Sequence, residues 1–173
     1  GALSADGTEG EIRRKMIERG LVEAIVILPR NLFYSTDISV TLWILNANKK
    51  ARIVHRNGEE IHYRDREKEI LFIDMRQMGE PFEKKYVRFT DEDICKVADA
   101  YHNWQREGHT ETYTDIPEFC KSVSVGEDGG IADKGFSLVP SKYIEFVNRD
   151  ESVDYDIRMK DCLLYTSPSP RDR

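Results

Sequence analysis

The chain has 173 residues, 39% hydrophobic and 34% charged, which is enough for one domain with a core of its own. Lys and Arg number 26 against 32 Asp and Glu, a formal charge of -6, which excludes nucleic-acid binding through a general basic surface. The longest uncharged apolar stretches, 24–29 and 38–47, are far shorter than a membrane span, so we expect no membrane protein. Three widely spaced cysteines indicate reduced thiols in a cytoplasmic protein.

Residues 1–52 have the pattern of an α/β sheet edge. Thr8 followed by Glu11 is a capping-box pattern, which predicts a short helix that ends at Gly20. Residues 21–28 are a mainly β-branched run and predict a strand buried on both faces. A polar, aromatic loop at 30–37 leads to a second such strand at 38–45. The order of helix, strand, loop and strand favours an α/β fold.

Residues 53–110 predict a small β extension followed by a helix. Asn57 and Gly58 lie between two short β-type runs and indicate a hairpin turn, and residues 70–73 predict another short strand. Thr90 predicts the N-cap of a helix that keeps apolar spacing to Gly108. We expect core positions on this helix for Tyr101, Trp104 and Cys95.

The remaining chain predicts little regular structure. Residues 109–135 are poor in apolar runs and predict loops, and the apolar patch at 136–146 is a candidate docking surface, so we treat 111–161 as a loop-rich C-terminal docking region. Residues 162–173 resemble the translation of a transposon-type sequencing adapter and continue no earlier pattern. We interpret them as a non-native tail, outside the fold, and expect the native chain to run on past Lys160.

No complete catalytic motif is present in the sequence. It contains no Gly-x-Gly for a dinucleotide or phosphate loop, no Asn-Pro-Pro-Tyr-like tetrad, and no Gly-x-Ser-x-Gly nucleophile elbow. The four histidines lie in separate segments without metal-ligand spacing, so we assign no metal site. The sequence therefore predicts no catalytic residue of its own.

A series of short motifs resembles, in order, the C-terminal part of the catalytic domain of the modification (methyltransferase) subunit of type I restriction-modification systems, an adenine-N6 DNA methyltransferase family. These motifs are GEIRRKMI at 10–17, EAIVILP at 23–29, NLFYST at 31–36, ISV at 38–40, LNANK at 45–49, IDMR at 73–76, TDEDI at 90–94, ADAYHNW at 98–104, IPEFCKS at 116–122 and LVPSKYI at 138–144. The resemblance departs from the family at Glu118, where the family usually has Gly, and at 140–143, where it usually has Pro-Gly-Arg-Tyr.

This resemblance implies a fold and a set of partners. It implies that the chain is the rear portion of a Rossmann-like S-adenosylmethionine-dependent methyltransferase sheet, with residues 1–52 as its last helix and strands and the final strand antiparallel to its neighbours. S-adenosyl-L-methionine and the Asn-Pro-Pro-aromatic tetrad would be held upstream of Gly1. The implied partners are DNA, a specificity subunit and a restriction subunit, in the bacterial or archaeal cytoplasm.

The loop at 30–37 supplies the candidate base-binding residues Asn31, Phe33 and Tyr34. An enzyme that acts on a base within a duplex must extrude that base, and an aromatic side chain can replace the lost stacking. Phe33 is the first candidate, with an aromatic plug at the end of the sheet as the equally weighted alternative. Lys49, Lys50 and Arg52 are candidate phosphate contacts, although short charge runs after a strand are more often only solvated.

The leading hypothesis is therefore a part of an adenine-N6 DNA methyltransferase, inactive by itself. The alternative is a non-enzymatic α/β interaction domain of a DNA-processing complex, in which Phe33 and Trp104 are structural and no cofactor binds. The acidic charge fits the first hypothesis, because a specificity subunit can supply much of the DNA contact.

Overall fold

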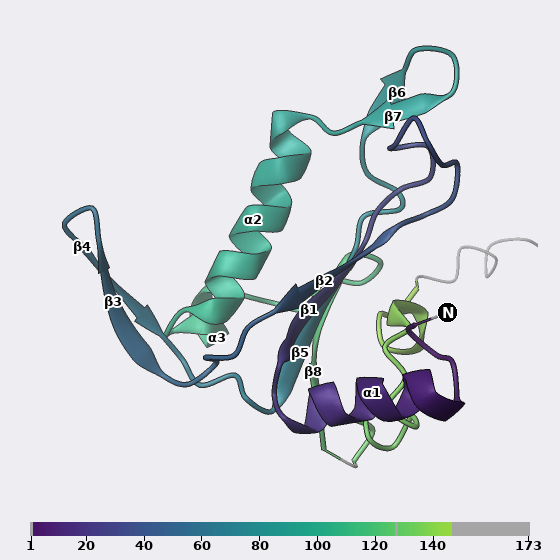
Figure 1. Cartoon of the computed structure of the whole chain (residues 1–173). Helices are drawn as coiled ribbons and strands as arrows, with labels where there is room; N and C mark the ends of the chain where they lie inside the picture. Colours follow the sequence, from purple (N-terminus) through teal and green to yellow (C-terminus); the bar gives the residue numbers. More distant parts are fainter. Residues whose placement is uncertain (1, 127, 147–173) are drawn as a thin grey trace, which may run out of the picture.

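The structure, a computed structural model, describes residues 2–126 and 128–146 (Figure 1). The predicted non-native tail at 162–173 and the end of the docking region lie outside the described residues. The described elements are α1 (Gly7–Glu18), β1 (Val22–Ile27), β2 (Thr41–Leu45), β3 (Arg52–Arg56), β4 (Glu59–Tyr63), β5 (Glu69–Asp74), β6 (Glu80–Phe82), β7 (Tyr86–Arg88), α2 (Asp91–Gln105), α3 (His109–Thr112), β8 (Cys120–Ser124) and a 3-10 turn, η1 (Pro140–Lys142).

The main sheet is mixed and has the order β2-β1-β5-β8. β1 pairs in parallel with β5, placing Ile25 opposite Phe72, and antiparallel with β2, placing Ile25 opposite Trp43. The predicted antiparallel pairing of the first two strands is therefore confirmed. β8 pairs antiparallel with β5 and forms the other edge. The fold is a mixed α/β fold.

The sequence prediction is correct for β1 but wrong for the burial of β2. The described side chains of β1 are buried along the strand except at Ile27, as expected of a strand covered on both faces. In β2, by contrast, Leu42 is 45% exposed and Leu45 is 54% exposed. Among the described residues β2 is an edge strand, so its side chains lack neighbours from a further strand that would cover them.

Two segments predicted outside the sheet belong to it. Residues 70–73, predicted as part of the β extension, form the middle of β5, and Leu71 and Phe72 are fully buried there. Residues 120–124, predicted as loop, form β8. β8 contains only two buried residues, Cys120 and Val123, so its strand character comes from pairing with β5 and not from an apolar run of its own.

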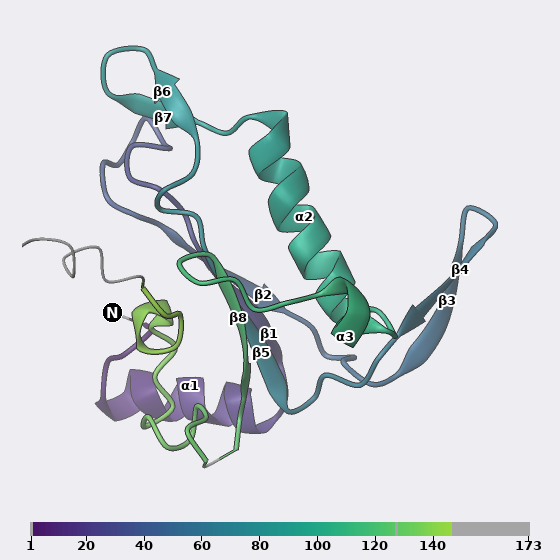
Figure 2. The same ribbon diagram turned by 180° about the vertical axis from the view of Figure 1, so that it is seen from behind.

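Helices and loops cover the two faces of the sheet, as the opposite views of Figures 1 and 2 show. α1 and the segment leading to η1 cover one face, where Tyr143 stacks on Phe72 at a centroid distance of 4.6 Å. α2 covers the other face with Trp104, which is fully buried. The apolar patch at 136–146 therefore does have a core, because Leu138 and Ile144 are buried against the sheet, contrary to the docking interpretation of these residues.

The sequence predicted the start of α2 and the end of α1 correctly, but not the start of α1. The Thr90 cap of α2 is confirmed: its hydroxyl accepts from the Asp93 amide at 3.1 Å and the Asp93 carboxylate accepts from the Thr90 amide at 3.0 Å. The predicted capping box of α1 is wrong, because the helix begins at Gly7 and no side chain caps it. The predicted end of α1 at Gly20 is confirmed by its φ of 66°.

Two further local predictions can be judged from the backbone. Asn57 and Gly58 have φ angles of 54° and 82° and turn the β3–β4 hairpin, as predicted; Figure 1 shows this hairpin projecting from the body. Glu118 has a φ of 61°, in the left-handed region that favours glycine, which explains the Gly usual in the resembled family. Cys95 is exposed, which corrects the prediction of a core position. No helix among the described residues is long and apolar enough to cross a membrane.

Candidate nucleic-acid interface

The loop between β1 and β2 is fixed at both ends by backbone hydrogen bonds. The Leu28 amide donates to the Val40 carbonyl at 2.8 Å, which holds the base of the loop together. Asn31 has a φ of 59° and its carbonyl accepts from the Val87 amide at 3.1 Å. The loop is thus tied to β7, more than fifty residues further along the chain.

This loop carries the three predicted base-binding residues, of which Asn31 and Tyr34 line one hollow. Asn31 is half-buried, Phe33 is 42% exposed and Tyr34 is 69% exposed. An aromatic plug at the end of the sheet would be buried, so the exposure of Phe33 favours an external role for its ring. Base binding by these residues stays a prediction.

The β6–β7 hairpin adds residues that the sequence analysis missed. Tyr86 meets Tyr34 edge to face, with ring centroids 4.6 Å apart, and the Lys85 ammonium lies 5.1 Å from the Tyr86 ring centroid. The only signal in the sequence was a lysine pair before a tyrosine, fifty residues from the loop. Loop and hairpin together enclose a hollow of about 190 Å³, lined by Asn31, Tyr34, Ser35, Thr36, Asp37, Lys85 and Tyr86.

Lys49 is not a phosphate contact in this structure, which corrects the prediction. It is only 2% exposed, and its ammonium donates to the carbonyls of Val22 and Glu69 at 2.8 and 2.7 Å. Burial lowers the pKa of Lys49 to about 8, partly offset by the nearby Glu23 carboxylate. The Lys49 ammonium is hydrogen-bonded inside the protein and cannot reach a ligand at the surface.

Lys50 and Arg52 lie at the other end of the sheet from the loop. They follow the end of β2, whereas the loop precedes its start. Lys50 is exposed and 4.0 Å from a Glu67 oxygen; the Arg52 guanidinium packs 5.0 Å from the Tyr63 ring centroid. The two sets of predicted DNA contacts are therefore not brought together, and phosphate binding by Lys50 or Arg52 stays a prediction for DNA away from the target base.

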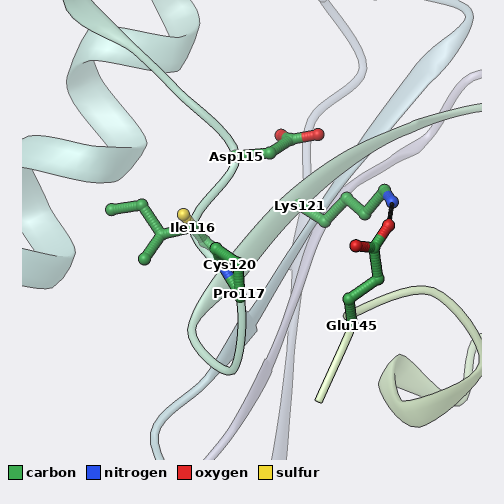
Figure 3. Close-up of a pocket in the computed structure, with 6 residues that line it drawn as sticks. All are labelled: Asp115, Ile116, Pro117, Cys120, Lys121 and Glu145. Atoms are coloured by element: carbon green, nitrogen blue, oxygen red, sulfur yellow. Dashed lines mark hydrogen bonds and ion pairs between the residues drawn. The ribbon is translucent and has the colours of Figure 1, made fainter. Parts of the chain in front are cut away.

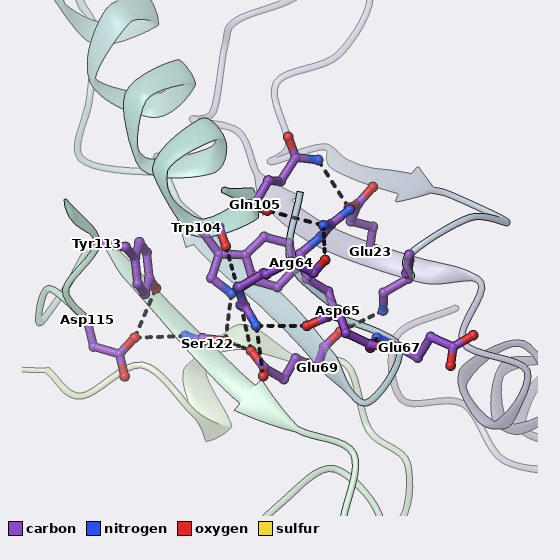
Figure 4. A network of polar contacts seen from close by, with 12 residues as sticks. Glu23, Arg64, Asp65, Glu67, Glu69, Trp104, Gln105, Tyr113, Asp115 and Ser122 are labelled. Carbon is purple, nitrogen blue, oxygen red and sulfur yellow. Dashed lines mark hydrogen bonds and ion pairs between the residues drawn. The ribbon is translucent and has the colours of Figure 1, made fainter. Parts of the chain in front are cut away.

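A buried ionic network fixes β1, the connection between β4 and β5, and α2 to one another (Figure 4). The Glu23 carboxylate accepts from Arg66 at 2.9 Å, from Gln105 at 3.1 Å and from Asn46 at 2.7 Å. Burial alone would raise the pKa of Glu23, but these hydrogen bonds hold it below its usual value. Because each charge is paired inside the network, we interpret it as structural and not as a reactive site.

The continuation of this network through Arg64 anchors β8. Arg64 forms a two-pronged ion pair with Glu69, at 3.0 and 2.8 Å, and Ser122 links Glu69 to the Trp104 indole, as Figure 4 shows. The Trp104 indole is therefore buried without an unpaired N–H group. The contacts explain why β8 holds its place with little apolar surface of its own.

A second hollow, of about 170 Å³, lies beside the start of β8 and contains a cysteine (Figure 3). Burial raises the pKa of the Cys120 thiol, which disfavours the reactive thiolate. Lys121 is paired with Glu145 at 2.8 Å, and the Asp115 carboxylate accepts from the Ser122 amide at 2.9 Å. The polar groups already have partners within the protein, and no nucleophilic site results.

The side chains at the carboxyl ends of β1 and β5 are packed or paired within the protein. At the carboxyl ends of β1 and β5, where an α/β sheet binds cofactors, stand Leu28, which is buried, and Asp74, which is bound by Arg76 at 2.6 Å. No glycine-rich turn follows either strand in 2–126 or 128–146. No group of His, Cys, Asp and Glu side chains in the described part could hold a metal ion.

The mixed sheet with helices on both faces, and with an exposed aromatic loop at the end of the parallel strand β1, places the protein in the class of α/β proteins. The comparisons identify the family: the chain belongs to the N-6 DNA methylase family, which matches residues 1–152. It is 36% identical over 162 residues to the type I restriction enzyme HindI methylase subunit of Haemophilus influenzae, covering 92% of this chain and 32% of that protein. It is 29% identical to the MjaIX methylase subunit of Methanocaldococcus jannaschii, covering 93% of this chain and 26% of that protein.

Solved structures agree with this family. The methyltransferase subunit of the type I restriction-modification system from Streptococcus thermophilus has a TM-score of 0.63 and 25% identity, over 84% of this chain and 25% of that chain. A structure from a study of type I complex assembly shares the fold, with a TM-score of 0.54 at 18% identity, over 95% of this chain and 30% of that chain. The chain spans about a third or less of the length of these relatives.

Proposed function

We propose that this chain is part of a type I restriction-modification methyltransferase that transfers a methyl group from S-adenosyl-L-methionine to adenine N6 in a specific DNA site. The observation that carries the proposal is the exposed Phe33 on a loop at the carboxyl end of β1, where ligands of α/β sheets bind. Family membership supports a base-binding role for this loop, because a base methyltransferase must extrude its target base and stack it on a new surface.

The chemistry assigned to these residues is the binding of the base. Phe33 offers a ring face to the extruded adenine and Asn31 offers an amide to its edge, while Tyr34 offers a ring and a hydroxyl to a base beside it. S-adenosyl-L-methionine supplies the methyl group when bound, and residues outside those described here hold it. We therefore assign the chain a positioning task and no step of methyl transfer.

β2 has no strand on its outer side among the described residues. This supports the proposal that the chain forms the rear portion of a larger, Rossmann-like sheet. An apolar hollow of about 320 Å³ lies against this edge between α1 and β2, lined by Ala2, Glu9, Ile12, Arg13, Met16, Trp43 and Leu45. An exposed edge strand with apolar side chains is a site for a further strand. In the proposed sheet, the cofactor-binding strands continue from β2.

The proposed partners are DNA, a specificity subunit that selects the site, and a restriction subunit, in the cytoplasm of a bacterium or archaeon. The formal charge of -6 supports this division of labour, because an acidic chain holds DNA only through local contacts. The names of the relatives are those of methylase subunits of such systems.

The gene on the N-terminal side of Gly1 tests the proposal against a non-enzymatic interaction domain. We expect that reading this frame upstream gives an Asn-Pro-Pro-Phe or Asn-Pro-Pro-Tyr tetrad, the group that holds the target amine. A complete frame without such a tetrad would rule out the methyltransferase and favour the interaction domain.

A further inference from the structure

The base-binding loop has no cation from the predicted set beside it, since Lys49 is buried and Lys50 and Arg52 lie at the far end of the sheet. Because β1 and β5 are parallel, the segments that follow them emerge at the same end. The loop follows β1, and the β6–β7 hairpin follows β5, as Figures 1 and 2 show. The hairpin therefore lies at the same end of the sheet as the loop, where it can supply a DNA contact beside the loop.

Two arginines at this end of the sheet already have carboxylate partners. Arg76 binds the Asp74 carboxylate at 2.6 Å, and Arg88 binds Glu80 through its Nε at 2.6 Å. Lys85 is exposed and forms no ion pair within the part of the chain that the structure describes. Its ammonium is held near the Tyr86 ring, so it is placed beside an aromatic surface and remains open to an anion.

The aromatic surface beside Lys85 is built from both segments. Tyr34, 69% exposed, meets Tyr86 edge to face at 4.6 Å, and the Asn31–Val87 hydrogen bond of 3.1 Å fixes the loop to the hairpin. A cation next to exposed aromatic rings is the arrangement that binds unstacked nucleotides: the rings contact the base and the cation contacts the phosphate. The hairpin provides the cation and one ring, and the loop provides the second ring.

We propose that the β6–β7 hairpin is a second DNA-contacting element, in which Lys85 binds a backbone phosphate and Tyr86, together with Tyr34, contacts a nucleotide beside the target adenine. This proposal rests on the proposed methyltransferase function. The hollow between the loop and the hairpin receives that nucleotide, and the Asp37 carboxylate that lines it accepts a hydrogen bond from an exocyclic amine. The phosphate lies at the Lys85 end of the hollow.

The test uses the complete methylase subunit that contains this chain, assembled with its specificity subunit on a duplex that carries the target site. Lys85→Gln is compared with Lys68→Gln, a matched control that removes an exposed lysine at the opposite end of β5. We expect Lys85→Gln to raise Kd several-fold at low salt and to reduce the salt slope of log Kd by about 0.9, with no change for Lys68→Gln.

A second variant separates the ring from the charge. Tyr86→Leu should raise Kd by about 5-fold to 150-fold, because base-aromatic stacking is worth about 1 to 3 kcal/mol, and it should leave the salt slope unchanged. Thermal melting of each variant shows that the fold is retained.

The outcomes distinguish this inference from the function on which it rests. If the unchanged complex methylates DNA but Lys85→Gln and Lys68→Gln behave alike, the hairpin contact is overturned and the methyltransferase stands. If the unchanged complex binds DNA without methylating it, the proposed function fails, and the salt slope of Lys85→Gln still decides whether the hairpin touches DNA.

Discussion

Lys49 is held inside the molecule by hydrogen bonds to two backbone carbonyls. Its burial makes the free energy of unfolding depend on pH. Burial lowers its pKa from 10.5 to about 8 in the folded chain. Between these values the unfolded chain binds more protons at this residue than the folded chain, so its contribution to stability rises with pH. We expect the unfolding free energy, relative to Lys49→Met, to rise by about 2 kcal/mol from pH 8 to 9.5 in urea titrations. A difference that does not change with pH would contradict the burial.

Glu23 is the acceptor on which the buried network depends, so its neutralisation should be costly. Glu23→Gln leaves the Arg66 guanidinium, whose side chain is fully buried, without its counter-ion. We expect a loss of about 3 to 5 kcal/mol in unfolding free energy. The control is Arg14→Gln in the exposed Arg14–Glu18 pair, for which we expect less than about 1 kcal/mol. Equal losses for the two variants would mean that the network does not stabilise the fold.

Phe33 should affect methylation more than it affects folding. Phe33 is 42% exposed, so Phe33→Ala removes less buried surface than truncation of a core phenylalanine and should lower the melting temperature less. Loss of base stacking should lower methylation of duplex DNA by an amount equivalent to about 1 to 3 kcal/mol. Measuring both quantities on one variant separates the roles: a large stability loss, with activity that merely follows the folded fraction, would make Phe33 structural.

At the scale of elements, β2 is the weak edge of the sheet. One side of its backbone has no strand partner among the described residues, and Leu42 and Leu45 are exposed. We expect these features to make the chain self-associate when it is produced alone. Leu45→Lys should reduce self-association in analytical ultracentrifugation, because a charged edge resists pairing. Ile53→Lys, on the projecting hairpin and equally exposed, should have much less effect. A monomeric unchanged chain would contradict a free edge at β2.

The elements that the sequence predicted well have local signals. The α2 cap depends on Thr90 and Asp93, three residues apart, and the β3–β4 hairpin on the adjacent Asn57 and Gly58. β8 had no such signal, because its strand conformation depends on pairing with β5, some fifty residues earlier. The same limit applies to the site. The loop residues were found because they are neighbours in sequence, whereas Tyr86 joins Tyr34 only through the pairing of distant strands.

At the scale of the whole molecule, the parallel pair β1 and β5 gives the sheet two different ends. One end carries the aromatic loop and the β6–β7 hairpin, and the other carries Lys50, Arg52 and the projecting β3–β4 hairpin. Because the chain is acidic as a whole, its proposed DNA contacts are confined to small surfaces. This agrees with the proposal that a partner subunit selects the DNA site.

The central claim is that this chain serves an adenine-N6 DNA methyltransferase, and transfer of labelled methyl groups tests it most directly. The complete subunit and its specificity partner are incubated with labelled S-adenosyl-L-methionine and duplex DNA, and the nucleosides are then separated. We expect label in N6-methyladenine at one site in each strand of the recognition sequence, and none with the 173-residue chain alone. A folded, DNA-bound complex that leaves adenine unlabelled, or that labels cytosine, would contradict it.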